Sequence, residues 1–405
     1  MEFTITRDEF FKGLQRAQGV ADTKGAIPIL SNILIEVEKS GIWIYATDLK
    51  IGIKGFYAAE VKNKGKFTIN ARKIFDIVRE LPEKDIHIRQ ESKVVSQQSA
   101  VEGEELSSEG QGPALSEVEG AEESIGLWIN LSCGNYKTRL PGLPVDEFPA
   151  FPSYGEDYLV KFKPDRLREM VKKTIFSISA DETRYTLNGT LLEVDSEVVK
   201  MVSTDGHRLS YIRSLDSEVK KQKAAEKKIS VIMPQKTTAE LLKLVEDGDE
   251  AVLFSMYENH VVFKKGDFIL VSRVIDGQFP NYDAVIPQNN DKRIIINKEL
   301  FIHALKRVSL LSDERSKMVK FKIEKNSMEL ISDTAGIGEA KETIDVKYDK
   351  EGLSVGLNAK YLIDVANAAD SEEIFLDMKD SASPTLFMPS NDENYKCVVM
   401  PMRLQ

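Results

Sequence analysis

The sequence predicts an α+β chain made of three similar domains, each with two helices packed on antiparallel sheets. Three observations predict this fold: a helical pattern recurs in each third of the chain, a pair of alternating strands follows it, and a second helical pattern follows the strands. Chance can produce one such match, whereas the same order in all three thirds indicates an internal repeat. The predicted domain boundaries are 1–152, 153–285 and 286–405.

The first helical pattern of each third has residues at positions i, i+4 and i+7, all apolar except Thr174, and this spacing places them on one face of a helix. These positions are Phe10, Leu14 and Ala17, then Leu167, Val171 and Thr174, and then Phe301, Leu305 and Val308. A basic residue follows each first position by six, at Arg16, Lys173 and Arg307. These helices are therefore expected to have an apolar face and a basic face.

Each first helix is followed by two strands in which apolar and polar residues alternate, as in half-buried antiparallel sheets. The first pair is ILSNILIEVEKSGIWIYATD and ends at Asp48, and the second is YTLNGTLLEVDSEVVKMVSTD and ends at Asp205. The third is VKFKIEKNSMELISDT, with Asp333 near its end. Because an aspartate side chain can bond its own backbone, we interpret this recurring residue as shaping the change from strand to turn.

A second helix then begins in each third, with NARKIFDIV at Asn70, PQKTTAELL at Pro234 and NAKYLIDVA at Asn358. Each has a basic residue four positions before an acidic one, a spacing that suits a side-chain ion pair on a helix. The pairs are Arg72 with Asp76, Lys236 with Glu240, and Lys360 with Asp364. Further strands are expected to close each domain.

One segment, 91–125, does not belong to the repeat. It is rich in Glu, Ser and Gly and has no aromatic residue, so it cannot bury enough apolar surface to offset the entropy of ordering the chain. Its nine Glu and one Lys account for −8 of the net charge of −10, which leaves a nearly neutral body that can carry a basic stripe. We predict a disordered loop, most simply a solvated one without function, inserted in a hairpin between His87–Gln90 and Leu127–Ser132.

The bulk composition narrows the class of protein. Apolar residues make up 42% of the chain, enough for substantial cores, and no run of about 18 apolar residues predicts a membrane span. The first residues, MEFTITRDEFF, lack the apolar stretch of a secretion signal. The two cysteines, Cys133 and Cys397, form neither a disulfide framework nor a metal motif, which fits a reducing cytoplasm.

The stretch STDGHRLS, Ser203–Ser210, groups hydroxyls, an aspartate, a histidine and an arginine, as hydrolase sites do. A hydrolase that uses Asp205 and His207 is therefore one alternative. Against it, none of the four histidines has a metal-binding spacing, and the chain has no GxSxG motif and no glycine-rich phosphate loop. Gly336 and Gly338 form only a GxG. The sequence therefore predicts no enzyme, no cofactor and no metal site, and it favours a binding role for His207.

Three stretches occur in order along the chain: STDGHRLS, LVSRVIDGQFPNYDAVIP and the terminal YKCVVMPMRLQ. Together with AIPILSNILIEV at Ala26–Val37, they resemble the bacterial DNA polymerase III beta subunit, the replicative sliding clamp. The resemblance covers the whole chain apart from 91–125. It implies three repeated DNA-clamp domains in a head-to-tail homodimer, which closes into a ring of six similar domains around duplex DNA. Twelve helices would line the hole, and a continuous sheet would form the outside.

The resemblance also implies what such a ring does. It would tether the replicative polymerase to DNA and make synthesis processive, without chemistry of its own, after an ATP-driven clamp loader has placed it. Repair polymerases and mismatch-repair proteins would be further partners, and all would insert short motifs with a Gln and Leu or Phe anchors. No membrane is involved, and the expected location is the cytoplasm, on the nucleoid. A scaffold of the same fold without a DNA role is a second alternative.

Basic residues on the repeated helices are the candidates for contact with DNA phosphates, which carry no sequence information and would let the ring slide. For any one of them, a solvated helix face is the alternative. The candidates on the helices are Lys12, Arg16, Arg72, Lys73, Arg168, Lys172, Lys173, Lys306 and Arg307. The resemblance adds Lys24 and Tyr185, which match DNA-touching loops of the family.

The resemblance places a peptide pocket between the second and third domains, where flexible Met side chains can repack around different partners. Carried over position by position, its residues are Leu187, Thr204, Gly206, His207, Arg208, Leu209, Pro280, Val285, Asn358, Tyr361, Val398, Met400, Pro401, Met402, Arg403 and Leu404. Taken alone, the terminal VVMPMRL is also typical of a last core strand. Two positions depart from the family pattern: Ala284 stands where relatives often carry a larger basic residue, and Gln405 extends past the usual terminal Leu.

Ring closure would join the edge of the first domain to the third. Tyr136, Thr138 and Leu140 alternate along a predicted edge strand, and Leu310 and Leu311 in SLLSDE match the facing family position. Ordinary core positions are the alternative for each of these residues.

Overall fold

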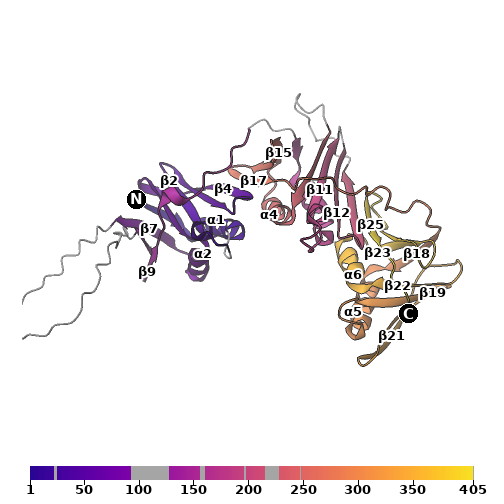
Figure 1. Cartoon of the computed structure of the whole chain (residues 1–405). Coiled ribbons are helices and arrows are strands. Elements are labelled where there is room, and N and C mark those ends of the chain that lie inside the picture. The colour runs from indigo at the N-terminus through magenta and orange to yellow at the C-terminus, as the bar shows by residue number, and fades with distance from the viewer. Residues whose placement is uncertain are drawn as a thin grey trace, which may run out of the picture. The chain divides into compact units, whose positions relative to one another are not determined.

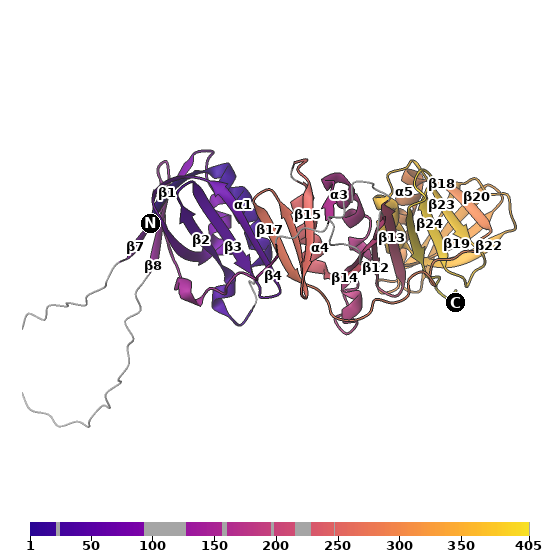
Figure 2. The same cartoon turned by 90° about the horizontal axis from the view of Figure 1, so that it is seen from above.

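The structure is a computed structural model, and it describes residues 1–21, 25–92, 127–155, 160–195, 198–214, 228–246 and 248–404 (Figures 1 and 2). These residues form two compact units, Met1–Phe151 and Pro152–Gln405. The predicted order of helix, strands, helix and strands occurs once in the first unit and twice in the second, and each copy also begins with a strand. The predicted α+β class with repeated antiparallel sheets is therefore confirmed.

The first unit contains the first copy. Its helices are α1 (Arg7–Val20) and α2 (Ala71–Glu80), which pack against each other. Its strands are β1 (Glu2–Thr6), β2 (Asn32–Glu38), β3 (Gly41–Thr47), β4 (Ile51–Ala58), β5 (Glu60–Asn63), β6 (Gly65–Asn70), β7 (Asp85–Ser92), β8 (Leu127–Cys133) and β9 (Tyr136–Pro141). They are hydrogen-bonded in the orders β5-β1-β7-β8-β9 and β4-β3-β2-β6.

Local sequence explains where the elements of this unit begin and which face they bury. The side chains of Thr6 and Asn70 accept hydrogen bonds from backbone N–H groups in the first turns of α1 and α2, which otherwise lack partners. Phe10, Leu14 and Ala17, expected on the apolar face of α1, are buried. Strands β7 and β8 pair as an antiparallel hairpin, as predicted, and residues 93–126 between them lie outside the described residues.

The second unit contains the other two copies. The second copy consists of β10 (Val160–Phe162), α3 (Pro164–Lys172), β11 (Gly189–Asp195), β12 (Val198–Thr204), β13 (Arg208–Ser214), β14 (Ile229–Pro234), α4 (Gln235–Glu246), β15 (Val252–Tyr257), β16 (His260–Lys265) and β17 (Phe268–Arg273). The third consists of β18 (Lys292–Asn297), α5 (Lys298–Val308), β19 (Met318–Glu324), β20 (Ser327–Thr334), β21 (Gly338–Asp345), β22 (Leu353–Asn358), α6 (Ala359–Ala368), β23 (Glu373–Met378), β24 (Thr385–Pro389) and β25 (Tyr395–Val399). In each copy the two helices pack together, as Figure 1 shows for α5 and α6. No helix among the described residues has the length and apolar composition that crossing a membrane requires.

A single sheet joins the second copy to the third (Figure 2). Its eight strands lie in the order β14-β11-β12-β13-β25-β24-β23-β18. At the junction β13 pairs with β25, so that Arg208 lies opposite Val399 and Ile212 opposite Tyr395. This pairing brings the turn before β13 next to the last residues of the chain.

The recurring aspartate shapes a turn in two copies out of three. Asp48 and Asp205 each accept two hydrogen bonds from backbone N–H groups of the turn that follows, as expected. Asp333, in contrast, lies inside β20 and is paired with a residue of β21, so the turn begins only after it. The prediction for Asp333 is therefore wrong, because β20 continues to Thr334.

The predicted helix ion pairs also differ between copies. The Arg72 guanidinium lies 3.0 Å from the Asp76 carboxylate on α2, as the spacing predicts. On α6 the Asp364 carboxylate lies 2.7 Å from Arg208, a residue of the second copy. Helical spacing identifies a neighbour on the same helix, and it cannot reveal a partner that tertiary packing supplies.

Candidate functional site

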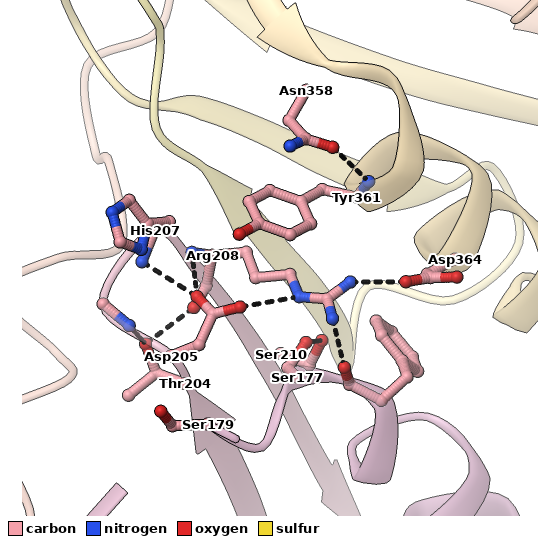
Figure 3. Close-up of polar contacts among 12 residues, drawn as sticks. Ser177, Ser179, Thr204, Asp205, His207, Arg208, Ser210, Asn358, Tyr361 and Asp364 are labelled. Carbon is pink, nitrogen blue, oxygen red and sulfur yellow. Dashed lines mark hydrogen bonds and ion pairs between the residues drawn. The ribbon is translucent and has the colours of Figure 1, made fainter. Parts of the chain in front are cut away.

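The turn between β12 and β13 is closed by its own side chains. Asp205 Oδ1 accepts hydrogen bonds of 2.9 Å from the backbone N–H groups of His207 and Arg208 (Figure 3). Thr204 Oγ1 donates to the carbonyl of Arg208 at 2.6 Å and accepts from the N–H of Gly206 at 3.1 Å. Gly206 has a φ of +86°, which side chains other than hydrogen rarely tolerate. The STDGHRLS stretch therefore forms a tightly bonded turn.

Arg208 is buried at the base of this turn, with 8% of its surface exposed. Its guanidinium donates to Asp205 Oδ2 at 3.1 Å, to Asp364 Oδ2 at 2.7 Å, and to the carbonyl oxygen of Phe176 (Figure 3). The guanidinium carbon also lies 4.4 Å from the ring centre of Tyr361 on α6. Burial, together with the nearby Asp205 carboxylate, raises the pKa of Tyr361, so the ring stays neutral beside the cation. Arg208 thus connects the second copy to α6 of the third.

These contacts argue against hydrolysis at this turn. Both oxygens of Asp205 are committed to the turn and its arginine, so the carboxylate does not orient the His207 ring (Figure 3). The hydroxyls of Ser177 and Ser210 are buried and lie 2.7 Å from each other. Burial raises the pKa of the Cys397 thiol to about 11, which keeps it from acting as a nucleophile at neutral pH. The described part of the chain also contains no cluster of His, Cys, Asp and Glu that could hold a metal ion.

An apolar pocket of about 190 Å³ lies beside the turn. Four segments contribute to its lining: the segment before β11, the turn between β12 and β13, the loop after β17 and the end of β25. The lining residues are Leu187, Thr204, Gly206, Arg208, Leu209, Phe279, Pro280, Tyr282, Val285, Val398 and Met400. Its floor is continuous with the core, because Leu209, Phe279 and Val398 belong to one buried apolar cluster. Val285 and Met400, by contrast, are each 39% exposed. A pocket of this size and lining can accept apolar side chains of a short peptide.

The last residues of the chain are fixed beside the pocket by backbone hydrogen bonds. The N–H of Met400 donates to the carbonyl of His207 at 2.9 Å, and that of Met402 donates to Gly356 at 2.8 Å. A Cβ atom on Gly356 would lie 2.9 Å from the carbonyl oxygen of Met402, so the glycine makes this approach possible. The terminal VVMPMRL therefore combines both alternatives: its first residues end the core strand β25, and Met400 after it lines the pocket.

The structure brings nine of the sixteen predicted pocket residues together: Leu187, Thr204, Gly206, Arg208, Leu209, Pro280, Val285, Val398 and Met400. The other seven lie outside this lining, namely His207, Asn358, Tyr361, Pro401, Met402, Arg403 and Leu404. Asn358 is used structurally, because its side chain caps α6 and donates to the carbonyl of Ser316 at 2.8 Å.

Two residues of the lining, Phe279 and Tyr282, were not predicted, although both stand in DGQFPNY. The signal that could have identified them is the motif itself, in which both aromatic residues flank the predicted Pro280. Ala284 is exposed and does not line the pocket. Gln405 lies outside the described residues.

Most predicted DNA-facing residues are accessible on their elements. Those that are exposed are Lys12, Arg72, Lys73, Lys172, Tyr185, Lys306 and Arg307. Arg16 and Arg168 are partly buried, and Lys24 lies outside the described residues. Several of these cations have acidic neighbours, since Lys12 lies 3.3 Å from Glu9 and Arg307 pairs with Glu342.

Lys173 contradicts its prediction as a DNA-facing residue. It is only 3% exposed, and its ammonium lies 2.6 Å from Glu169, 3.3 Å from Asp370 and 3.2 Å from Asp392. Burial alone would lower the pKa of Lys173, but the Glu169 and Asp392 carboxylates raise it above its ordinary value, so the side chain stays charged. Its charge is therefore used inside the second unit and is not available to a phosphate.

The residues predicted for ring closure lie at the edges of sheets. Tyr136, Thr138 and Leu140 belong to β9, which ends the order β5-β1-β7-β8-β9 among the described strands. Leu310 and Leu311 lie in a 3-10 turn after α5, next to β21. β21 is an edge strand of the sheet β21-β20-β19-β22 among the described strands. Leu310 is 78% exposed in the single chain, which is unusually high for a leucine side chain. Such exposure is typical of a residue that another protein surface covers.

Comparison with known proteins gives one consistent result. Models of the DNA polymerase III beta subunit match the chain three times, with the N-terminal domain at residues 1–109, the central domain at 161–281 and the C-terminal domain at 283–403. The beta sliding clamp of Caulobacter vibrioides is 34% identical over 408 residues and that of Escherichia coli 29% over 410, each match covering 100% of both chains. Among solved structures, a Pseudomonas aeruginosa sliding clamp bound to griselimycin matches with 28% identity and a TM-score of 0.84, covering 100% of both chains.

Proposed function

The chain belongs to the DNA polymerase III beta subunit family, the bacterial beta sliding clamps, and on this premise we propose which of its surfaces serve a clamp. It is a DNA sliding clamp, a non-catalytic processivity factor that acts with DNA and DNA polymerase. The observation that carries this conclusion is the match of three successive domain models to the three copies of the repeat. The hydrolase alternative has no support, since Asp205 is committed to its turn.

The three copies are proposed as clamp domains at 1–152, 153–285 and 286–405, and two chains as a head-to-tail ring. An edge strand has backbone groups without partners, which another chain can pair with. The end strands β9 and β21 are such edges among the described strands, and Leu310 next to β21 offers an apolar anchor. We therefore assign the closing contact to β9 of one protomer and the β21 edge of its partner.

Replacing Leu310 with Asp is expected to separate the ring into monomers, because it places a charge in the centre of an apolar contact. Light scattering at micromolar concentration should give about twice the 45.5 kDa chain mass for the unaltered protein and the mass of one chain for the variant. Leu300→Asp is the matched control, since Leu300 is another exposed leucine of the third copy, on α5 before the 3-10 turn, and lies outside the proposed contact. A dimer that persists in Leu310→Asp would refute this interface.

The DNA-facing surface is proposed from the exposed cations of the helices, without Lys173. Contacts from Lys12, Arg72 and Arg307 would reach phosphates and carry no sequence information. Each of these cations already has a carboxylate neighbour, and such exposed ion pairs reduce the net attraction to a polyanion. Weak attraction suits a protein that must move along its DNA. Enclosure would then hold it there, on the nucleoid of the cell.

Loading on circular and linear DNA is the experiment that tests the function. The clamp loader with ATP should place the protein on nicked circular DNA. In gel filtration in 0.5 M salt (on the order of three times physiological strength), the protein should elute together with the DNA. Cutting the circle should release the protein within minutes, because enclosure fails at a free end. Binding that survives linearisation would indicate adhesion, and a failure to load would favour the scaffold without a DNA role.

The pocket is proposed as the site for partner proteins. Polymerases, the clamp loader and mismatch-repair proteins would insert short motifs whose Leu or Phe side chains enter the apolar lining, while a Gln binds polar groups at the border. Two similar clamps, from Pseudomonas aeruginosa and Bartonella birtlesii, were solved with griselimycin bound, which supports a ligand site on this fold. Because all partners would use one pocket, they should compete with one another.

A further inference from the structure

The loop after β17, residues 276–286, lies between two surface cavities, a pocket and a groove, and contributes to the lining of each. Phe279, Pro280 and Tyr282 line the pocket of about 190 Å³. The same three residues also line a second groove of about 630 Å³, which Glu193 of β11 borders as well. Phe279 and Tyr282 pack into the buried apolar cluster. Because the loop also has open space on both sides, we expect a polar anchor to add to this packing in fixing its position.

Tyr282 provides the polar anchor of this loop to the sheet. Its hydroxyl donates to Glu193 Oε2 at 2.6 Å, and the Lys200 ammonium donates to the same hydroxyl at 3.5 Å. These two hydrogen bonds connect 276–286 to β11 and β12. Glu193 is buried, and its other oxygen lies 2.9 Å from Lys228, so the acceptor is itself held in place.

The protonation states of this pair make the bond a strong one. Burial raises the pKa of Tyr282 far above neutral pH, and the Glu193 carboxylate raises it further. Burial alone would raise the pKa of Glu193, but hydrogen bonds from Tyr282 and Lys228 hold it below its ordinary value. The phenol therefore remains a donor and the carboxylate remains charged near neutral pH. Such charge-assisted hydrogen bonds are roughly twice as strong as neutral ones.

We propose that Glu193 and Tyr282 are positioning residues for partner binding: their hydrogen bond holds loop 276–286 as a wall of the pocket and so sets its affinity for partner peptides. Glu193 acts from outside the pocket lining. The inference rests on the proposed peptide-binding role of the pocket. The Tyr282 ring also packs against Tyr211, with ring centres 5.8 Å apart, so removing the hydroxyl leaves the apolar wall present without its anchor.

The test is a double-mutant cycle on the full-length dimer, with Tyr282→Phe, Glu193→Ala and the double variant. Binding is followed by the fluorescence anisotropy of a labelled synthetic nonapeptide that contains one Gln followed by Leu and Phe. Each single variant should weaken binding about tenfold, the loss expected for one charge-assisted hydrogen bond. The double variant should be no weaker than the singles, because one bond is lost in all three. Retention on circular DNA should not change.

Tyr348→Phe is the matched control, because it removes another buried phenol hydrogen bond, to the carbonyl of Glu351, in the third copy. It should lower the melting temperature by a similar amount and leave peptide affinity unchanged, which separates positioning from general stability. Should Glu193→Ala fail to fold, Glu193→Gln keeps the shape and an acceptor, and an intermediate loss is expected.

The outcomes separate the two proposals. If the unaltered protein binds the peptide saturably and the single variants bind it within twofold, the positioning role is wrong and the pocket stands. Losses that multiply in the double variant would also overturn it, since the two residues would then act independently. If the unaltered protein does not bind the peptide at all, the pocket assignment fails and this inference fails with it.

Discussion

Deleting Met400–Gln405 is expected to abolish stimulation of the polymerase while leaving the dimer intact. Met400 lines the pocket, and its backbone bond to His207 fixes the terminal segment against the turn. Removing it opens one side of an apolar site, and losing a dominant apolar contact of this kind weakens binding by ~30-fold or more. The residues proposed for ring closure lie elsewhere, on β9 and beside β21.

Primer extension on a singly primed circular template should fall to the level seen without a clamp, while light scattering still shows a dimer. Removal of Gln405 alone is the control, because it keeps Met400 in the pocket lining, and it should keep full stimulation. Stimulation that survives the longer deletion would show that polymerase uses another surface. The melting temperature must also be measured, since the deletion removes the hydrogen bond between Met402 and Gly356.

Arg208→Ala is expected to destabilise the second unit strongly and to weaken peptide binding. The change leaves the carboxylates of Asp205 and Asp364 and the carbonyl of Phe176 without their shared donor. Removing one member of a buried ion pair costs about 3–5 kcal/mol, which for a unit of this size lowers the melting temperature by roughly 6–20 °C. Peptide affinity should fall as well, because Arg208 supports the turn and lines the pocket.

Differential scanning calorimetry and peptide titration check this expectation. Arg213→Ala is the matched control, because Arg213 lies on the same strand β13, is exposed, and donates to Asn394 at 2.8 Å. It should change stability by less than about 1 kcal/mol. If the Arg208→Ala variant had the same melting temperature as the unaltered protein, the buried network would make no net contribution to stability. Arg208→Lys should recover only part of the loss, because one ammonium cannot reach three acceptors in different directions.

Hydrophobic periodicity and its recurrence along the sequence were sufficient to predict the repeated helices and strands. The apolar spacing of Phe10, Leu14 and Ala17 lies on α1, and the second helices expected from Asn70 and Asn358 begin one residue later, with each Asn as the cap. These signals are local, so a single sequence contains them in full. The β7–β8 hairpin was also predictable, because alternating strands flank the acidic segment on both sides.

The partners of buried charges could not be predicted in this way. Lys173 stands at the same repeat position as Arg16 and Arg307, yet only Lys173 meets carboxylates of Asp370 and Asp392, about two hundred residues further along the chain. The helical pattern shows the face on which a residue lies, and it does not show what packs over that face. The same limit applies to Tyr282 and Glu193, whose contact depends on the path of a loop.

The β13–β25 junction has a consequence for how the second unit folds. Ser210 and Cys397 touch across it although 187 positions separate them in the chain. A contact of such long range forms only after a large loop has closed, and high contact order slows folding. The two copies that share this sheet should therefore reach their native state together, with the docking of β25 as a late kinetic step. Until then a newly made chain would have helices and hairpins but would lack the pocket proposed for partner proteins.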